Sequence, residues 1–268
     1  MRFGGPVGVA AIVALGACWA TMGVAEAGTL RATYSISLVG LPIGVVDVNA
    51  QFAGAHYNVD AHARLSGIAS WIKNARGASA GAGELIEGKV SPSTFATSAS
   101  SDAMTRTIRM AMAANSVVGV DIQPPFEDRP DRVPVSERDK QGIVDPVGGF
   151  LIPAPVGVPP TSPAACNRTL PIFDGWTRFD ITLTYVGERK VKTKGYSGPV
   201  AICSVRYVPI SGHRRDRPAT KFMAENKDIE VWLAPVAGTN ALFPYRASVR
   251  TMIGTVTGEA TEFRVDGK

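Results

Sequence analysis

Apolar and polar residues alternate along much of the chain with a period of two, which is typical of half-buried β-strands. Runs rich in glycine, serine and asparagine separate the alternating segments, and these residues favour turns. The clearest alternating segments are 34–38, 46–52, 57–65, 108–112, 118–122, 179–185, 201–207, 229–233 and 245–249. One apolar face per strand favours antiparallel pairing, so the pattern predicts a mainly β protein.

The middle of the chain breaks this alternation. Residues 123–171 contain the proline-rich runs QPPFEDRPDRVPV and PAPVGVPPTSPAACNRTLP, and proline lacks the N–H group that a strand ladder needs. We therefore expect two strand-rich halves, 28–122 and 172–268, joined by a crossing at 123–171. Each half alone has few strands to shield an apolar face, which favours a single curved domain over two domains with a flexible linker.

Helical signals are weak, and at most one or two short helices are expected. The best candidate is 145–153, where Asp145 suits the N-cap, Pro146 the first helical position and Pro153 the end. The small-residue run GASAGAG at 77–83 is a poor helix former. It is better suited to a strand that bends or lies close to a neighbour.

The first 27 residues have the pattern of a signal peptide. Arg2 precedes an apolar run from 7 to 24, and Ala25-Glu26-Ala27 suits cleavage before Gly28. This predicts an exported, periplasmic protein with no transmembrane anchor after cleavage. The alternatives are a retained anchor and a lipidated Cys18, because Leu15-Gly16-Ala17-Cys18 resembles a lipobox.

Two cysteines remain in the mature chain, Cys166 and Cys203. An even pair in an oxidising compartment is typical of a disulfide. Two free buried thiols are the alternative, and a metal site lacks further ligands at suitable spacing.

Charge excludes one class of partner. The net charge is +5, but the basic residues are scattered among acids, with no basic stripe interleaved with aromatics. We therefore expect no binding to nucleic acid. A mild positive charge favours loose contact with anionic polymers or lipid head groups.

No catalytic motif is evident, and no cofactor or metal motif is found. Three histidines, His56, His62 and His213, are the only imidazole bases, and no Gly-x-Ser-x-Gly elbow is present. In FDGWTRFD, Arg178 and Asp180 share one face of a strand and Asp174 lies beyond a glycine. This spacing permits an Asp–Arg–Asp network, which suits a structural ion pair, ligand anchoring or acid–base chemistry.

The segment LVGLPIGVVDV at 38–48 predicts a hairpin with an unusual apolar tip. Gly40, Pro42 and Gly44 suit a tight turn. Leu41 and Ile43 either fold back as a lid on the core, or contact lipid or line the mouth of a binding trough.

The chain contains several short motifs whose order resembles that of the domain of unknown function 3108 family. They are YSISLVGLPIGVVDV, DPVGGF, FDGWTRFDITL, and VWLAP followed by FPYR. The succession of Cys166, Phe173-Asp174-Gly175, Tyr196, Gly198-Pro199 and Cys203 is similar to the pattern of an alphaproteobacterial branch of this family. Gly148-Gly149 stands where members usually have serine. The resemblance implies an exported envelope protein with a strongly curved, half-barrel-like antiparallel sheet, and no established activity, catalytic residue or cofactor.

These observations favour a non-enzymatic binding or assembly protein that holds an apolar or lipid-like ligand on the concave face of the sheet. The candidate contacts are Leu41, Ile43, Asp174, Arg178 and Trp232. One alternative is a structural domain that pairs with a partner and holds no small ligand. The other is a hydrolase acting on an envelope polymer with Asp174, Arg178 and His213.

Overall fold

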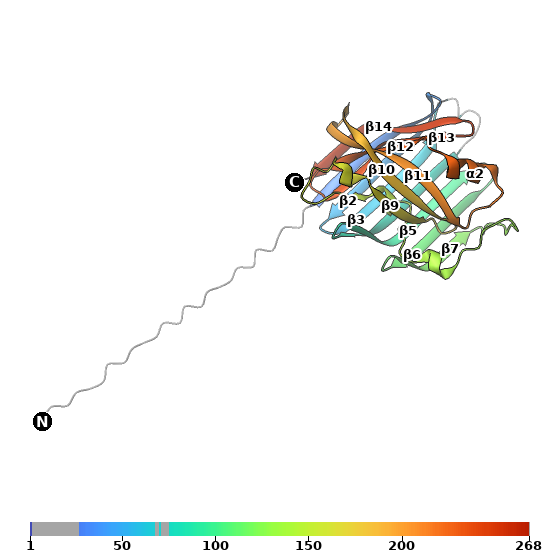
Figure 1. Cartoon of the computed structure of the whole chain (residues 1–268), viewed down its shortest axis with the longest axis horizontal. Coiled ribbons are helices and arrows are strands. Elements are labelled where there is room, and N and C mark those ends of the chain that lie inside the picture. The colour runs from blue at the N-terminus through green and yellow to red at the C-terminus, as the bar shows by residue number, and fades with distance from the viewer. Residues whose placement is uncertain (2–26, 68–69, 71–74, 268) are drawn as a thin grey trace.

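The computed structural model describes residues 1, 27–67, 70 and 75–267, and these residues form one antiparallel sheet of 14 strands (Figure 1). The spatial order is β7-β6-β5-β4-β3-β2-β1-β14-β13-β12-β11-β10-β9, with the short β8 paired to β13. The strands are β1 (Ala27–Leu38), β2 (Leu41–Ala53), β3 (His56–Leu65), β4 (Ala75–Ile86), β5 (Lys89–Ser101), β6 (Thr105–Ala113), β7 (Ser116–Gln123), β8 (Ile152–Pro153), β9 (Arg168–Phe173), β10 (Arg178–Thr193), β11 (Tyr196–Ser211), β12 (Ile229–Val236), β13 (Ala241–Thr251) and β14 (Gly254–Gly267).

The sheet curls on itself but does not close. In Figure 1, β10 and β11 cross in front of the blue and green strands β2–β5, and inner-face residues of both groups share one core, among them Phe95, Val200 and Phe263. β1 pairs with β14 and thereby joins the two halves. The expected curved antiparallel sheet is confirmed.

The crossing fills the gap between the free edges β7 and β9. The Val144 N–H donates to the Pro171 carbonyl at 2.8 Å, and the Ile143 N–H donates to the Asn115 carbonyl, also at 2.8 Å. Asn115 lies in the β6–β7 turn, while Pro171 lies in β9. The crossing therefore hydrogen-bonds to both ends of the sheet and supports its curl.

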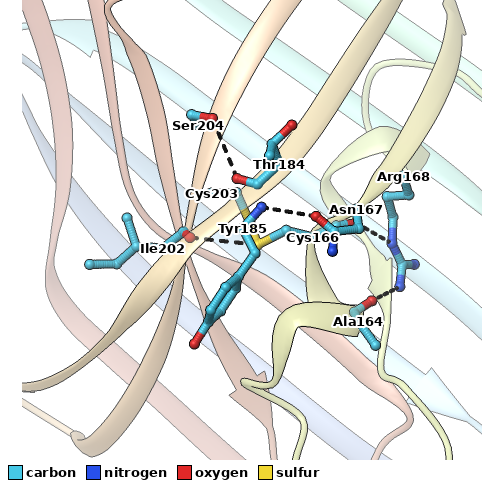
Figure 2. The surroundings of a disulfide bond; sticks show 9 residues. All are labelled: Ala164, Cys166, Asn167, Arg168, Thr184, Tyr185, Ile202, Cys203 and Ser204. Carbon is cyan, nitrogen blue, oxygen red and sulfur yellow. Dashed lines mark hydrogen bonds between the residues drawn. A yellow bond between two sulfur atoms is a disulfide. The ribbon is translucent and has the colours of Figure 1, made fainter.

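A second apolar core lies on the opposite face of the C-terminal strands. Leu183, Val205 and Leu233 from β10, β11 and β12 pack there with Ile152 and Ala165 from the crossing. Cys166 and Cys203 form a disulfide that fastens the crossing to β11 (Figure 2). The crossing therefore covers this face of the sheet as well as joining the halves.

The long β10–β11 hairpin closes one end of the curl. β13 pairs with β14 only from Gly254 to Glu259, so the β14 backbone beyond that point is free on this side. The hairpin tip takes the vacant place, because the Phe263 N–H donates to the Lys194 carbonyl at 2.9 Å. Tyr196 packs edge-on against Phe263, with ring centroids 5.4 Å apart.

Helices are few. The expected helix at 145–153 is reduced to a 3-10 turn at Gly148–Phe150, because two glycines favour helix poorly and Ile152–Pro153 pairs with β13 instead. Helix α2 (Pro218–Glu225) was not expected. It is short, and its Met223 packs against the second core.

The predicted signal segment 1–27, including Cys18, lies almost entirely outside the described residues. Within the described ranges, no helix is both long and apolar enough to span a membrane.

Replacing both Cys166 and Cys203 by alanine should lower the free energy of unfolding by about 3–4 kcal/mol, because the bridge closes a loop of 37 residues in the unfolded chain. Urea denaturation of the oxidised protein and of the double variant measures the difference. Equal free energies of unfolding would mean that the disulfide does not stabilise the protein.

Candidate functional site

The inner face of β3, β4 and β5 changes from large to small side chains along the strands. Near the β2–β3 turn, the pairing register aligns Val59, Gly81 and Phe95. Four residues further along, it aligns Ala63, Gly77 and Ala99. Inner side chains of a curled sheet fill its interior, so these small residues leave space at the end where β3 and β5 finish. We call this the mouth end.

That space is a cavity of about 380 Å³, which we call the inner cavity. Its lining includes Ile36, Val46, Val48, Ala63, Ala99 and Phe243. Ala63 and Ala99 are apolar inner-face residues, yet both are exposed, because the cavity is open to solvent.

The inner cavity continues into a second space of about 600 Å³ at the mouth end. Ile36, Val46, Ala63, Gly77, Thr97 and Ala99 line both spaces. The second space, the mouth, adds Ile43, Leu65, Met104 and Phe126, with Arg64, Arg76 and Arg106 among its polar residues. The two spaces together form an apolar trough with a cationic rim.

The crossing supplies the floor of the trough. Pro146, Val147 and Phe150 line the inner cavity, while Ile143 and Leu151 are buried in the core behind it. Val147 lies so close to β4 that a Cβ atom at Gly81 would be 2.9 Å from its side chain. The predicted role of the GASAGAG run, close approach to a neighbour, is therefore seen at Gly81.

Asp145 holds this floor in place and is fully buried. Its Oδ1 accepts hydrogen bonds from the Val147 and Gly148 N–H groups at 2.8 and 3.0 Å. Among the described residues, its Oδ2 and the Tyr57 hydroxyl have no hydrogen-bond partner. Burial raises the pKa of Asp145 to about 6, and the two N–H donors oppose this rise only in part.

This pKa predicts how stability depends on pH. Between about pH 3.8 and 6 the unfolded chain releases the Asp145 proton while the folded chain retains it, so rising pH destabilises the fold until about pH 6. Asp145→Asn keeps an oxygen acceptor and cannot ionise. The free energy of unfolding of this variant, relative to that of the native chain, should therefore rise by about 2–3 kcal/mol as the pH increases from 4 to 7.

Urea denaturation at both pH values measures this gain. Asp60→Asn on β3 is the matched control, because it removes the same charge from an exposed position. A constant difference between Asp145→Asn and the native chain across this range would contradict the raised pKa of Asp145.

The hairpin tip that contains Leu41 lies at the mouth end. Leu41 is 65% exposed, so it is not a lid on the core, whereas the half-buried Ile43 lines the mouth. Val39 (68%), Met252 (60%) and Ile253 (77%) are also exposed. A Cβ at Gly254 would be 2.3 Å from the Val39 side chain, which places the β13–β14 tip beside the β1–β2 tip. We call Val39, Leu41, Met252 and Ile253 the apolar tips.

The other three predicted contacts lie outside the trough. The Asp174 Oδ1 accepts hydrogen bonds from the Trp176 and Thr177 N–H groups at 2.9 and 2.6 Å and thereby shapes the turn before β10. Arg178 pairs with Asp180 at 2.6 Å. Trp232 is 7% exposed within the core, and its Nε1 donates to the Glu230 carboxylate at 2.6 Å.

The residues of the hydrolase alternative do not meet in one pocket. His213 lines a pocket that neither Asp174 nor Arg178 lines. His56 is exposed beside Glu84, with 3.4 Å between Nδ1 and Oε1, and His62 is exposed on β3. Within the described ranges, no cluster of three or more His, Cys, Asp or Glu side chains is placed to hold a metal ion.

Sequence reasoning missed the small lining residues Ala63 and Ala99 and the floor residue Phe150. The available signal was the strand alternation itself. It places alanine, glycine and threonine on the same face as Tyr57 and Phe95, but nearer the mouth end.

The fold and the trough define a barrel-like β protein with one open curved sheet. The chain belongs to the family described as Protein of unknown function (DUF3108), whose model matches residues 33–261. No curated protein gave a match. The chain is similar to the beta-barrel-like protein of domain of unknown function DUF1849 from Brucella abortus, with 10% identity, a TM-score of 0.48, and coverage of 91% of this chain and 98% of that chain.

Proposed function

We propose that this protein is a non-enzymatic carrier that binds a lipid-like apolar ligand in the trough. The observation that carries the proposal is the inner cavity, where Ile36, Val46 and Val48 lie beside alanine and glycine on one inner face that side chains do not fill. Volumes of about 380 and 600 Å³ lie in the range of small-molecule sites. Each methylene group that such a ligand buries contributes about 0.8 kcal/mol.

The shape of the trough suits a chain-like ligand. Val147 and Phe150 from the crossing line the inner cavity, and Ile43 and Phe126 line the mouth. An acyl chain entering at the mouth would meet apolar side chains along its length, and the polar end of the molecule would stay at the rim.

The proposed place of action is the periplasm, on the basis of the N-terminal signal pattern. The apolar tips give a ligand a route from a membrane, because they flank the mouth and expose Leu41 and Ile253 to solvent. Contiguous exposed apolar side chains often mark contact surfaces. Arg76, which is exposed at the same rim, adds attraction for an anionic membrane surface.

Filling the trough should abolish binding without harming the fold. In the double variant Ala63→Leu/Ala99→Leu, both added side chains point into the inner cavity. We expect at least a tenfold loss of affinity for the neutral hydrophobic fluorophore N-phenyl-1-naphthylamine, measured by fluorescence titration. The melting temperature should stay unchanged or rise, because the leucines bury apolar surface.

Ala96→Leu is the matched control, since Ala96 lies on β5 but on the opposite face from Phe95 and Ala99. It should bind the fluorophore as the native chain does. If the native chain does not bind, or the filled variant binds equally well, the carrier proposal is wrong. The alternative of a structural domain without a small ligand would then remain.

Removing the apolar tips should weaken membrane contact. Leu41→Ser/Ile253→Ser changes two exposed side chains, so stability should change by less than about 1 kcal/mol. Binding to anionic phospholipid vesicles, measured by co-sedimentation, should fall about tenfold or more, because each residue buries apolar area in the bilayer interface.

Val118→Ser is the control for this experiment, because Val118 is 67% exposed but lies on the edge strand β7. Equal loss of vesicle binding in both variants would contradict a specific role for the apolar tips.

A further inference from the structure

A third space of about 500 Å³ adjoins the mouth, and five arginines line it. We call it the arginine pocket. Arg106 and Phe126 line both the mouth and this pocket, so the two spaces lie side by side. The other arginines are Arg129, Arg132, Arg214 and Arg217. Glu127 is the single carboxylate among the residues that line it in the described part of the chain.

Three of these guanidinium groups form no ion pair within the described residues. Arg106 donates from Nε to the Pro124 carbonyl at 3.0 Å, and Arg132 donates to the carbonyls of Gly212 and Trp176 at 3.1 and 2.9 Å. Neutral carbonyls leave the charge on these groups uncompensated. The side chain of Arg217 is exposed and has no hydrogen bond or ion pair there.

Nearby carboxylates neutralise only part of the pocket. Glu127 pairs with Arg129, and Asp131 pairs with Arg214 at 3.0 Å. Asp128 and Asp174 act on Arg132 through space, but the Asp174 carboxylate already accepts two backbone N–H groups. The pocket therefore keeps an excess of positive charge at Arg106 and Arg217.

Aromatic rings hold two of the five arginines in place. The Arg132 guanidinium lies 3.4 Å from the Trp176 ring centroid, and the Arg106 guanidinium lies 4.0 Å from that of Phe126. The two rings contact each other, with centroids 4.6 Å apart. Stacking of this kind fixes a guanidinium without using all of its donors. Thr177 and Thr220 also line the pocket.

We infer that the ligand of the trough is an anionic amphiphile, with its acyl chain in the inner cavity and its phosphate head group in the arginine pocket. This inference rests on the proposed carrier function and adds the class of ligand to it. Phosphate presents several acceptor oxygens to converging guanidinium groups, which is the geometry that arginine suits best.

A matched pair of ligands tests the inference. Lysophosphatidic acid and monoacylglycerol with the same acyl chain differ only in the phosphate group. Both are titrated against bound N-phenyl-1-naphthylamine, below their critical micelle concentrations and at low ionic strength. We expect lysophosphatidic acid to bind at least tenfold tighter, and salt to reduce this ratio because it screens exposed charges.

Two variants locate the source of the preference. Arg217→Gln and Arg106→Gln should each reduce the ratio of the two affinities about fivefold, as expected for one cationic group near an anion. Arg217→Gln keeps the backbone carbonyl that accepts hydrogen bonds from the Thr220 and Lys221 N–H groups at the start of α2. Lys192→Gln is the charge-matched control, because Lys192 is exposed near the opposite end of the β10–β11 hairpin.

The outcomes separate the two proposals. If neither ligand displaces the fluorophore, the carrier function itself is wrong. If both displace it with equal affinity, the trough binds acyl chains but the head-group inference is overturned. Binding of inorganic phosphate alone, without any advantage of lysophosphatidic acid over monoacylglycerol, would show an anion site independent of the trough and would also overturn it.

Discussion

The space inside the curl depends on a mismatch between the curvature of the sheet and the side chains on its inner face. A closed or nearly closed sheet of this size needs large inward side chains to fill it. Tyr57, Val59 and Phe95 supply them at one end, whereas Ala63, Gly77 and Ala99 do not at the other. The same strands therefore make a packed core and an open trough, and the change occurs within four residues along each strand.

The proline-rich crossing makes this arrangement stable. Val147 and Leu151 fill the inner face next to the trough, and Ile152 with Ala165 covers the outer face of the C-terminal strands. Proline limits the number of unfolded conformations and so lowers the entropic cost of ordering such an irregular segment. The disulfide at Cys166 acts in the same direction by closing a loop around the second core. Buried Asp145 acts in the opposite direction near neutral pH, because its charge has only two N–H donors beside it.

Much of the fold could be predicted from the sequence because strand alternation and turn residues are local signals. The hairpin at Gly40 is of this kind. The disulfide could be predicted for another reason, because Cys166 and Cys203 are the two cysteines that follow the predicted signal segment. The trough could not be predicted, because it depends on register between strands, which brings Ala63, Gly77 and Ala99 together. The arginine pocket was missed for a related reason. Its arginines come from the crossing, from β6 and from the loop after β11, so in the sequence they are scattered among acids.

The open trough is itself an argument for function. Fully burying a leucine side chain on this face would contribute roughly 1.5–3 kcal/mol to stability. At Gly77 there is room for a side chain, because no neighbouring atom lies closer than 3.7 Å to a Cβ placed there. The fold therefore forgoes apolar burial for which there is room at Gly77. Proteins commonly give up stability at the sites where they act, and compensate elsewhere. Here the compensation lies in the crossing and the disulfide, and the sacrifice is confined to the face that opens toward the apolar tips and the arginine pocket. An apolar face left unfilled in this way is what the proposed carrier of amphiphiles requires.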